Sequence, residues 1–230
     1  MKHTIEHGPS FAWLKLELDA GESVEAEAGA MVSMSTTVQM STRLNAGRAA
    51  GFFRKIWAIF VAFARKIFGG ETAFINEFTA EQGGEVIVAP TLAGQIVHHK
   101  LDGSKKLIVQ SGSYLASSGN IDTKLRFGGL KSLFGGEGGF MLECSGEGDL
   151  FLNAYGGIIP IPVEGSYVVD TGHMVAFDDT LDFKIRGVGG LKSTMMSGEG
   201  LVMEFNGAGT VYIQSRNLGS LVGWISPMLK

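Results

Sequence analysis

Cysteine, proline and long apolar runs are scarce in this chain of 230 residues. The single cysteine, Cys144, leaves no partner for an internal disulfide, which is typical of a reducing compartment. No run of about 18 uncharged apolar residues occurs, so we expect no membrane-spanning helix. The first ten residues also contain no apolar core of the signal-peptide type. We therefore expect a cytoplasmic protein.

Charge is also sparse, and it is not basic. Charged residues make up 18% of the chain and the formal net charge is −4, whereas 45% of the residues are hydrophobic. A nucleic-acid-binding domain usually has a basic balance or a basic stripe, so nucleic acid is not an expected partner. The apolar content is high enough to offset the entropy of folding, which excludes a disordered chain.

Patterns that carry chemistry are equally scarce. The five histidines include His3 with His7 and His98 with His99, but on strands the first pair is too far apart to bind one ion and the second pair points to opposite faces. No cysteine and histidine spacing matches a zinc site. The glycine string at 135–139 has no Gly-Lys-Ser/Thr after it, and no nucleophile elbow is present. We therefore predict a protein without enzymatic activity, with no catalytic residue, no metal ligand and no cofactor.

Two further features have structural explanations. Cys144 matches Phe205 in an internal repeat described below, which predicts a buried apolar filler and not a nucleophile. The cluster of Asp178, Asp179 and Asp182 lacks the longer alternation of oxygen ligands that a calcium loop needs. We expect it to form a solvated turn.

Glycine, by contrast, is abundant. The chain contains 34 glycines without a Gly-X-Y period, and they separate short apolar stretches, as turns and bulges of an all-β protein do. Residues 14–18 alternate between apolar and charged side chains with a period of two, which indicates a strand with one wet face. Short strands separated by glycine turns predict a sandwich or barrel.

The chain repeats itself. Residues 128–153 match residues 189–214 at 9 of 26 positions without a gap, and both segments begin with GGLKS. Residues 107–126 match residues 167–186 in the same way just upstream. Each copy is expected to contain a strand pair that ends near Lys-x-Arg, a glycine-rich connection, an apolar strand, a Gly-x-Gly turn and a second strand.

A weaker first copy precedes these two, with related segments at 25–40 and 68–90. We therefore predict a single compact unit of three tandem β-sandwich or barrel-like repeats around a pseudo-threefold axis, because one copy alone could not bury its apolar face. The predicted repeats span about 10–90 (with a helical insertion at 46–70), 91–153 and 154–218, followed by a C-terminal tail at 219–230.

The insertion contains an amphipathic helix, expected at about 51–68, which reads GFFRKIWAIFVAFARKIF. On a helical wheel its four basic side chains share one face and the apolar side chains fill an arc of about 220°. No acidic residue occurs between Ala28 and Gly70, so this region concentrates positive charge in an acidic protein. The residues expected to contact a membrane or a partner are Phe52, Phe53, Arg54, Lys55, Ile56, Trp57, Phe60, Phe63, Arg65 and Lys66.

Three interpretations of this helix remain open. Its apolar arc packs on the protein's own sheets or on a neighbouring subunit, so that the helix is purely structural. Alternatively, it lies on an anionic membrane surface, with basic residues on the polar face and Phe and Trp on the other. In the third interpretation it binds a protein partner.

Three stretches carry a family resemblance: GESVEAEAGAMVSM at 21–34, EGSYVVDTGHMVAF at 164–177 and FNGAGTVYIQSRNL at 205–218. Together they resemble the altered-inheritance-of-mitochondria family of the Aim twenty-four type. The resemblance implies a fold similar to the tryptophan RNA-binding attenuation protein (TRAP-like), several times per chain, and a homo-oligomer, with a trimer favoured. It also implies a link to mitochondrial inner-membrane organisation in eukaryotic relatives, but no activity and no catalytic residues.

These observations favour a non-enzymatic scaffold or interaction protein, oligomeric, that associates peripherally with the inner face of a membrane through the helix at 51–68. The alternatives are an RNA- or small-ligand-binding oligomer, by analogy with the TRAP-like fold, and an oligomer in which that helix is buried. Because fold does not imply function, the RNA alternative depends on the analogy alone.

Overall fold

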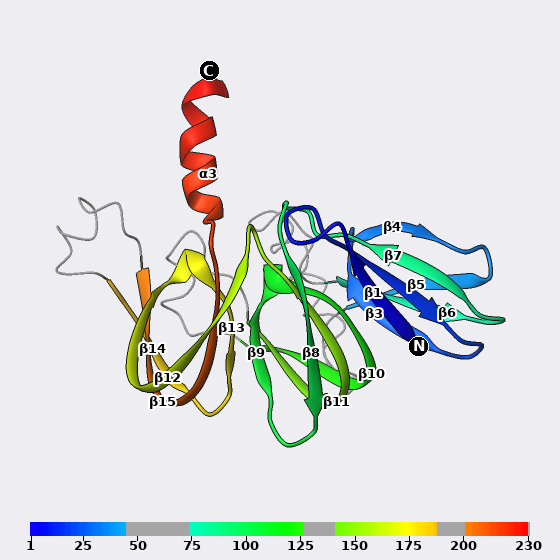
Figure 1. Cartoon of the computed structure of the whole chain (residues 1–230), viewed down its shortest axis with the longest axis horizontal. Helices are drawn as coiled ribbons and strands as arrows, with labels where there is room; N and C mark the ends of the chain where they lie inside the picture. The colour runs from blue at the N-terminus through cyan, green and yellow to red at the C-terminus, as the bar shows by residue number, and fades with distance from the viewer. Residues whose placement is uncertain (45–73, 127–140, 188–200, 230) are drawn as a thin grey trace, which may run out of the picture.

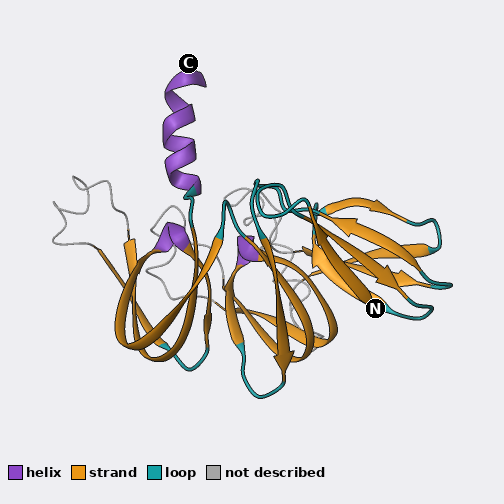
Figure 2. Ribbon diagram, viewed as in Figure 1, coloured by secondary structure: helices purple, strands orange, loops and turns teal. Residues whose placement is uncertain are grey.

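The computed structural model describes residues 1–44, 74–126, 141–187 and 201–229. Strands dominate this part of the chain, and Figure 2 shows them with short helical segments between and after them. The prediction of an all-β protein is therefore confirmed. The predicted helix at 51–68 lies outside the described residues.

The strands fall into three consecutive groups along the chain. The first group contains β1 (Lys2–Glu6), β2 (Trp13–Leu18), β3 (Ser23–Glu27), β4 (Met31–Met34), β5 (Val38–Leu44), β6 (Phe74–Ala80) and β7 (Gly84–Val88). The second contains β8 (Ile96–Asp102), β9 (Leu107–Gln110), the 3-10 turn η1 (Ser111–Ser113), β10 (Tyr114–Arg126) and β11 (Met141–Asn153). The third contains β12 (Ile158–Asp170), η3 (Thr171–His173), β13 (Met174–Asp178), β14 (Asp182–Gly187) and β15 (Leu201–Gln214).

These strands form two antiparallel sheets. The smaller sheet has the order β1-β2-β7-β4, and the larger one runs β12-β15-β13-β9-β11-β10-β3-β6-β5, with β14 beside β15 and β8 beside β11. In Figure 1 the three groups follow one another along the longest axis, with β4 near one end and β12 near the other. The larger sheet therefore connects all three groups.

Strand β2 shows why the sequence folds in this way. Leu14, Leu16 and Leu18 point to one face and are buried, whereas Lys15 and Glu17 point to the other face. Lys15 forms an ion pair of 2.6 Å with a glutamate of β7, the strand next to β2. Period-two alternation thus places one side of the strand in the core and keeps the other side wet.

The glycines of the long strands act differently from the prediction. A Gly-x-Gly turn was expected in each copy, but β11 runs unbroken through Gly146 and Gly148, and β15 runs unbroken through its equivalent glycines. The prediction of a turn is therefore wrong in the second and third copies. Gly146 has a φ of 111°, and a Cβ on Gly148 would overlap the carbonyl oxygen of Ser118. Glycine at these positions lets β10 and β11 approach closely and permits a positive φ within a strand whose hydrogen-bonded pairing stays continuous.

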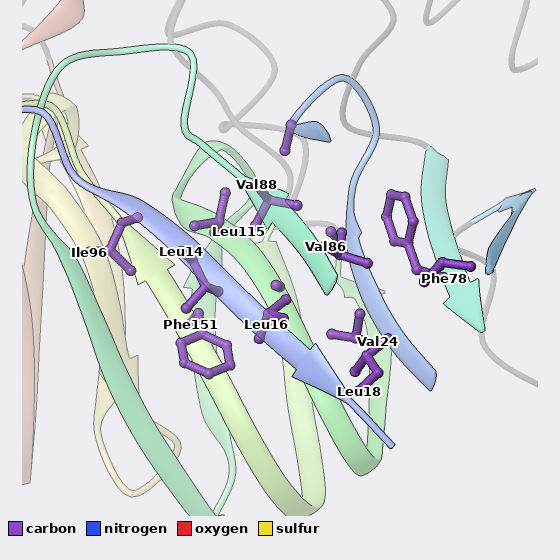
Figure 3. Close-up of a cluster of buried hydrophobic side chains, with 14 of the residues drawn as sticks. Leu14, Leu16, Leu18, Val24, Phe78, Val86, Val88, Ile96, Leu115 and Phe151 are labelled. Carbon is purple, nitrogen blue, oxygen red and sulfur yellow. The ribbon is translucent and has the colours of Figure 1, made fainter. Parts of the chain in front are cut away.

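Three hydrophobic clusters fill the interior, and each draws residues from a neighbouring group. Figure 3 shows the first cluster, where Leu115 of β10 and Phe151 of β11 lie beside Leu14 of β2. The second cluster contains Val175 of β13 among residues of the second group. The core therefore crosses the boundaries between groups and does not divide the chain into independent units.

The chain then leaves the sheets as a short helix, α3 (Leu218–Ile225), followed by the 3-10 turn η4 (Ser226–Leu229). The sequence predicts only a tail from residue 219, so this helix is an addition. Asn217 caps it by accepting a 3.1 Å hydrogen bond from the backbone N–H of Ser220. The predicted repeat boundaries and the pseudo-threefold axis stay predictions.

Candidate interaction surfaces

Strand β4 carries the first exposed apolar surface. It ends the smaller sheet and pairs with β7 along one side, with Met31 opposite Val88 and Met34 opposite Val86. Met31, Val32 and Met34 are all exposed. Among the described residues no strand pairs with its other side. Unpaired backbone groups beside exposed apolar side chains form a template for pairing with another chain.

The second exposed edge lies in β12, which ends the larger sheet. This strand pairs with β15 along its whole length, from Ile158 opposite Gln214 to Asp170 opposite Val202. Within the ranges that the structure describes, its outer side has no strand partner. Near its end, Tyr167 and Val168 are exposed. Each of the two sheets therefore ends in a strand with exposed apolar residues.

Helix α3 provides the third surface. It projects away from the strand groups in Figure 1, and none of its residues is buried. Leu218, Val222 and Trp224 of the helix are exposed, as are Met228 and Leu229 of the turn after it. No charged residue occurs from 217 to 229. A contiguous apolar patch of this kind usually marks a contact with a partner or a membrane.

A polar cluster joins β1, β8 and β11. His98 Nε2 lies 2.8 Å from Asp149 Oδ1, and the Nζ atom of Lys100 donates a 3.1 Å hydrogen bond to the same oxygen. The imidazole rings of His3 and His98 lie 4.4 Å apart between centroids, and both contact the ring of Phe151. Strand pairing produces this cluster, because β8 aligns His98 with Phe151 and Lys100 with Asp149 on β11.

Electrostatics explain the state of this cluster. Burial lowers the pKa of His3, and the nearby His98 lowers it further, so His3 is neutral near pH 7. Burial by itself would raise the pKa of Asp149, but hydrogen bonds from His98 and Lys100 outweigh this effect, and the pKa is lowered. Asp149 is therefore an ionised carboxylate with two donors on one oxygen.

The same three side chains are the only described group of this kind whose geometry suits a metal ion. The candidate ligand atoms of His3, His98 and Asp149 lie within 4.8 Å of one another. However, the ammonium group of Lys100 already occupies one oxygen of Asp149, and a cation there would meet like-charge repulsion. The arrangement fits a structural hydrogen-bond network better than a metal centre.

The sequence misses this cluster for a clear reason. His3 and His98 are 95 positions apart, and no motif links them; only knowledge that β1 approaches β8 brings them together. The expectation that His98 and His99 point to opposite faces is confirmed, because His99 contacts Tyr212 at 5.9 Å between centroids and not the ring of Phe151. Neighbouring residues on a strand must diverge in this way.

The other residues singled out from the sequence have structural roles. Cys144 is fully buried, and burial followed by the charge of Glu143 raises the pKa of its thiol far above the usual range. The prediction of an apolar filler is therefore confirmed. Asp178 ends β13 and accepts a 2.9 Å hydrogen bond from the N–H of Thr210, and Asp182 begins β14; Asp179 lies in the turn between these strands and accepts a hydrogen bond from the N–H of Lys106. The ten residues predicted to contact a membrane or partner, within 51–68, lie outside the described residues.

None of the described helices is long and apolar enough to cross a membrane.

Comparison with known proteins identifies the family. Residues 3–216 match the model of the family described as "Mitochondrial biogenesis AIM24". An uncharacterized protein of Streptococcus pyogenes serotype M6 is 33% identical over 232 residues, covering 100% of this chain and 91% of that protein.

The fold has a solved counterpart. The X-ray crystal structure of a Streptococcus pyogenes protein superposes with a TM-score of 0.80 at 30% identity, covering 99% of both chains. Sequence and fold thus agree over nearly the whole length, and the chain belongs to the AIM24 family.

Proposed function

We propose that this protein is a non-enzymatic interaction scaffold that works as a homo-oligomer, with a trimer favoured. One observation carries the proposal: β4, a strand at the edge of its sheet, presents Met31, Val32 and Met34 to solvent. Monomeric soluble proteins usually protect such edges with charges, prolines or covering loops. An apolar edge left in this state is best explained by a partner that covers it.

The lack of an enzymatic role is supported by the chemistry of the described side chains. Cys144, the one thiol, is buried with a raised pKa, so little thiolate is available for nucleophilic attack. Asp149, the acid of the His3–His98–Asp149 cluster, is held by Lys100 and is not poised near neutral pH for proton transfer. These groups are suited to stability and not to acid–base catalysis.

The proposed architecture is three TRAP-like repeats in tandem. A shared pairing supports it: in each of the three groups the strand after a tight turn pairs antiparallel with the last strand of the group, β4 with β7, β10 with β11 and β13 with β15. Gly112 and Gly172, which match in sequence, both lie in 3-10 turns, and Gly29 lies in the corresponding turn of the first group with a φ of 91°.

The molar mass in solution tests the proposal. We expect multi-angle light scattering at micromolar concentration to give a stable multiple of the chain mass of 24.5 kDa, with three copies favoured. A mass of one chain at every concentration would contradict the oligomeric scaffold.

A second candidate function is peripheral attachment to an anionic membrane. The basic and aromatic segment 51–68 is its sequence support. Helix α3 adds an observation from the structure, because it projects from the strand groups (Figure 1), exposes Trp224 and contains no charged residue. Interfacial helices bind through such apolar side chains, and nearby basic residues attract anionic lipid.

Flotation with liposomes tests this candidate. We expect binding to phosphatidylserine-containing vesicles and not to neutral ones, and loss of binding when Arg54, Lys55, Arg65 and Lys66 are replaced by Glu. Equal binding by this variant would contradict the electrostatic attachment, and no binding by the native protein would contradict the membrane role. Trp224→Ser provides a separate measure of the contribution of α3.

A further inference from the structure

The three strand groups are joined by two similar junctions within the larger sheet. At one junction β13 pairs with β9, with Ala176 opposite Val109 and Phe177 opposite Ile108. At the other, β10 pairs with β3, with Ala116 opposite Ala26. In both cases the strand that follows a tight turn pairs antiparallel with the strand that precedes the corresponding turn of the previous group.

The first group has such a strand after its turn, but among the described residues no other group provides a strand for it to pair with. This strand is β4, which follows the turn at Gly29 as β10 follows η1 and β13 follows η3. Like β10 and β13, it pairs on one side with the last strand of its own group, and all three contain a register shift at the same place. Strand β4 therefore corresponds to β10 and β13, but unlike them it pairs with no strand of another group among the described residues.

Side-chain burial follows the same correspondence. Val32 of β4 has the position of Leu115 in β10 and of Val175 in β13, but it is 51% exposed whereas both of these are 0% exposed. Leu115 reaches the core of the first group, and Val175 reaches the core of the second group. Among the described residues, the core of the third group contains no counterpart of Leu115 or Val175 contributed by another group.

The strand that could complete such a junction lies in the third group. The end of β12, before η3, has the position of β9 before η1 and of β3 in the first group. Ile108 of β9 is buried beneath β13, whereas its counterpart Val168 is 45% exposed. Strand β4 and the end of β12 thus correspond to the two partner strands of an internal junction, and they lie near opposite ends of the longest axis (Figure 1).

We propose that β4 of one copy pairs antiparallel with 167–170 of β12 in a second copy, in the register of the internal junctions. Ser33 then lies opposite Val169 and Met34 opposite Val168, and Val32 enters the core of the third group of the second copy. This inference rests on the self-association proposed above and names its surface. Because the two patches differ, the contact is heterologous and copies join head to tail until a ring closes.

Two single variants test the head-to-tail contact. Val32→Asp blocks the β4 edge and leaves β12 intact, and Val168→Asp does the opposite. Each variant alone is expected to have the mass of one chain, 24.5 kDa. An equimolar mixture is expected to reach twice that mass and no more, because one intact junction forms between the two variants and cannot propagate.

The chain offers matched controls of similar exposure away from the proposed contact. Ile159, also in β12, is 46% exposed, and Val222 in α3 is 54% exposed. Ile159→Asp and Val222→Asp are expected to keep the native oligomer. If both edge variants keep the native mass, the proposed register is overturned although the oligomeric scaffold stands. If the native protein is a monomer, both the proposed strand pairing and the oligomeric scaffold are contradicted.

Disulfide trapping provides a second test in case a charged variant fails to fold. Met34 and Val168 are exposed and lie opposite each other in the proposed register. A mixture of Met34→Cys and Val168→Cys is expected to form a covalent dimer on oxidation, since directly opposed strand residues approach disulfide distance. The buried Cys144 does not interfere. Equal trapping of Met34→Cys with Ile159→Cys would overturn the register.

Discussion

Replacement of Leu115 by alanine tests how tightly the strand groups depend on one another. Leu115 belongs to β10 of the second group, but it is fully buried in the core of the first group beside Leu14. Removal of three side-chain carbons costs about 0.8 kcal/mol for each, or about 2.4 kcal/mol, and the residual cavity raises the cost to about 3–4 kcal/mol. For a chain of this length each kcal/mol lowers the Tm by about 2–4 °C, so we expect a decrease of about 6–16 °C.

Urea unfolding followed by circular dichroism gives the loss of free energy, and calorimetry gives the Tm. Leu218→Ala in α3 is the matched control, because the same truncation at an exposed site should change stability by about 0.5 kcal/mol or less. A Leu115→Ala variant as stable as this control would refute the conclusion that β10 completes the core of the preceding group. A single cooperative transition lowered by the expected amount would support it.

Three further predictions follow from the described side chains. Burial and then His98 lower the pKa of His3, so protonation of His3 opposes folding. The free energy of unfolding should therefore fall as the pH decreases below about 6.5. Urea titration should show that His3→Gln loses less free energy of unfolding than the native protein between about pH 7 and pH 5. The thiol of Cys144 should react with a thiol reagent only at the rate of unfolding, and fast labelling of the native protein would contradict its burial. Gly148→Ala should lower the free energy of unfolding by about 2 kcal/mol or more in urea, because the new Cβ overlaps the backbone oxygen of Ser118; an unchanged value would mean that the strands separate without cost.

Local pattern was sufficient to predict much of the fold. The alternation in 14–18 predicts β2, because a strand with one buried face requires a period of two. The match between Cys144 and Phe205 predicts a shared core position, and both side chains are fully buried. Such features depend on near neighbours in the sequence or on a detectable internal repeat, so the sequence alone can reveal them.

Other features depend on approaches between distant strands. A Gly-x-Gly sequence indicates a turn by local rules, but at Gly146 and Gly148 the neighbouring β10 fixes a continuous strand and requires the missing Cβ atoms. His3 meets His98 because β1 lies close to β8, and no spacing predicts that contact. The exposure of Val32 is likewise invisible in the sequence, since its counterparts Leu115 and Val175 are buried.

The mass of an equimolar mixture of Val32→Asp and Val168→Asp tests the central claim most directly. Head-to-tail pairing of β4 with β12 predicts two variants that are monomeric alone and form a dimer of twice 24.5 kDa when mixed. A mixture that stays monomeric, or variants that each keep the mass of the native oligomer, would contradict the pairing of these two edges.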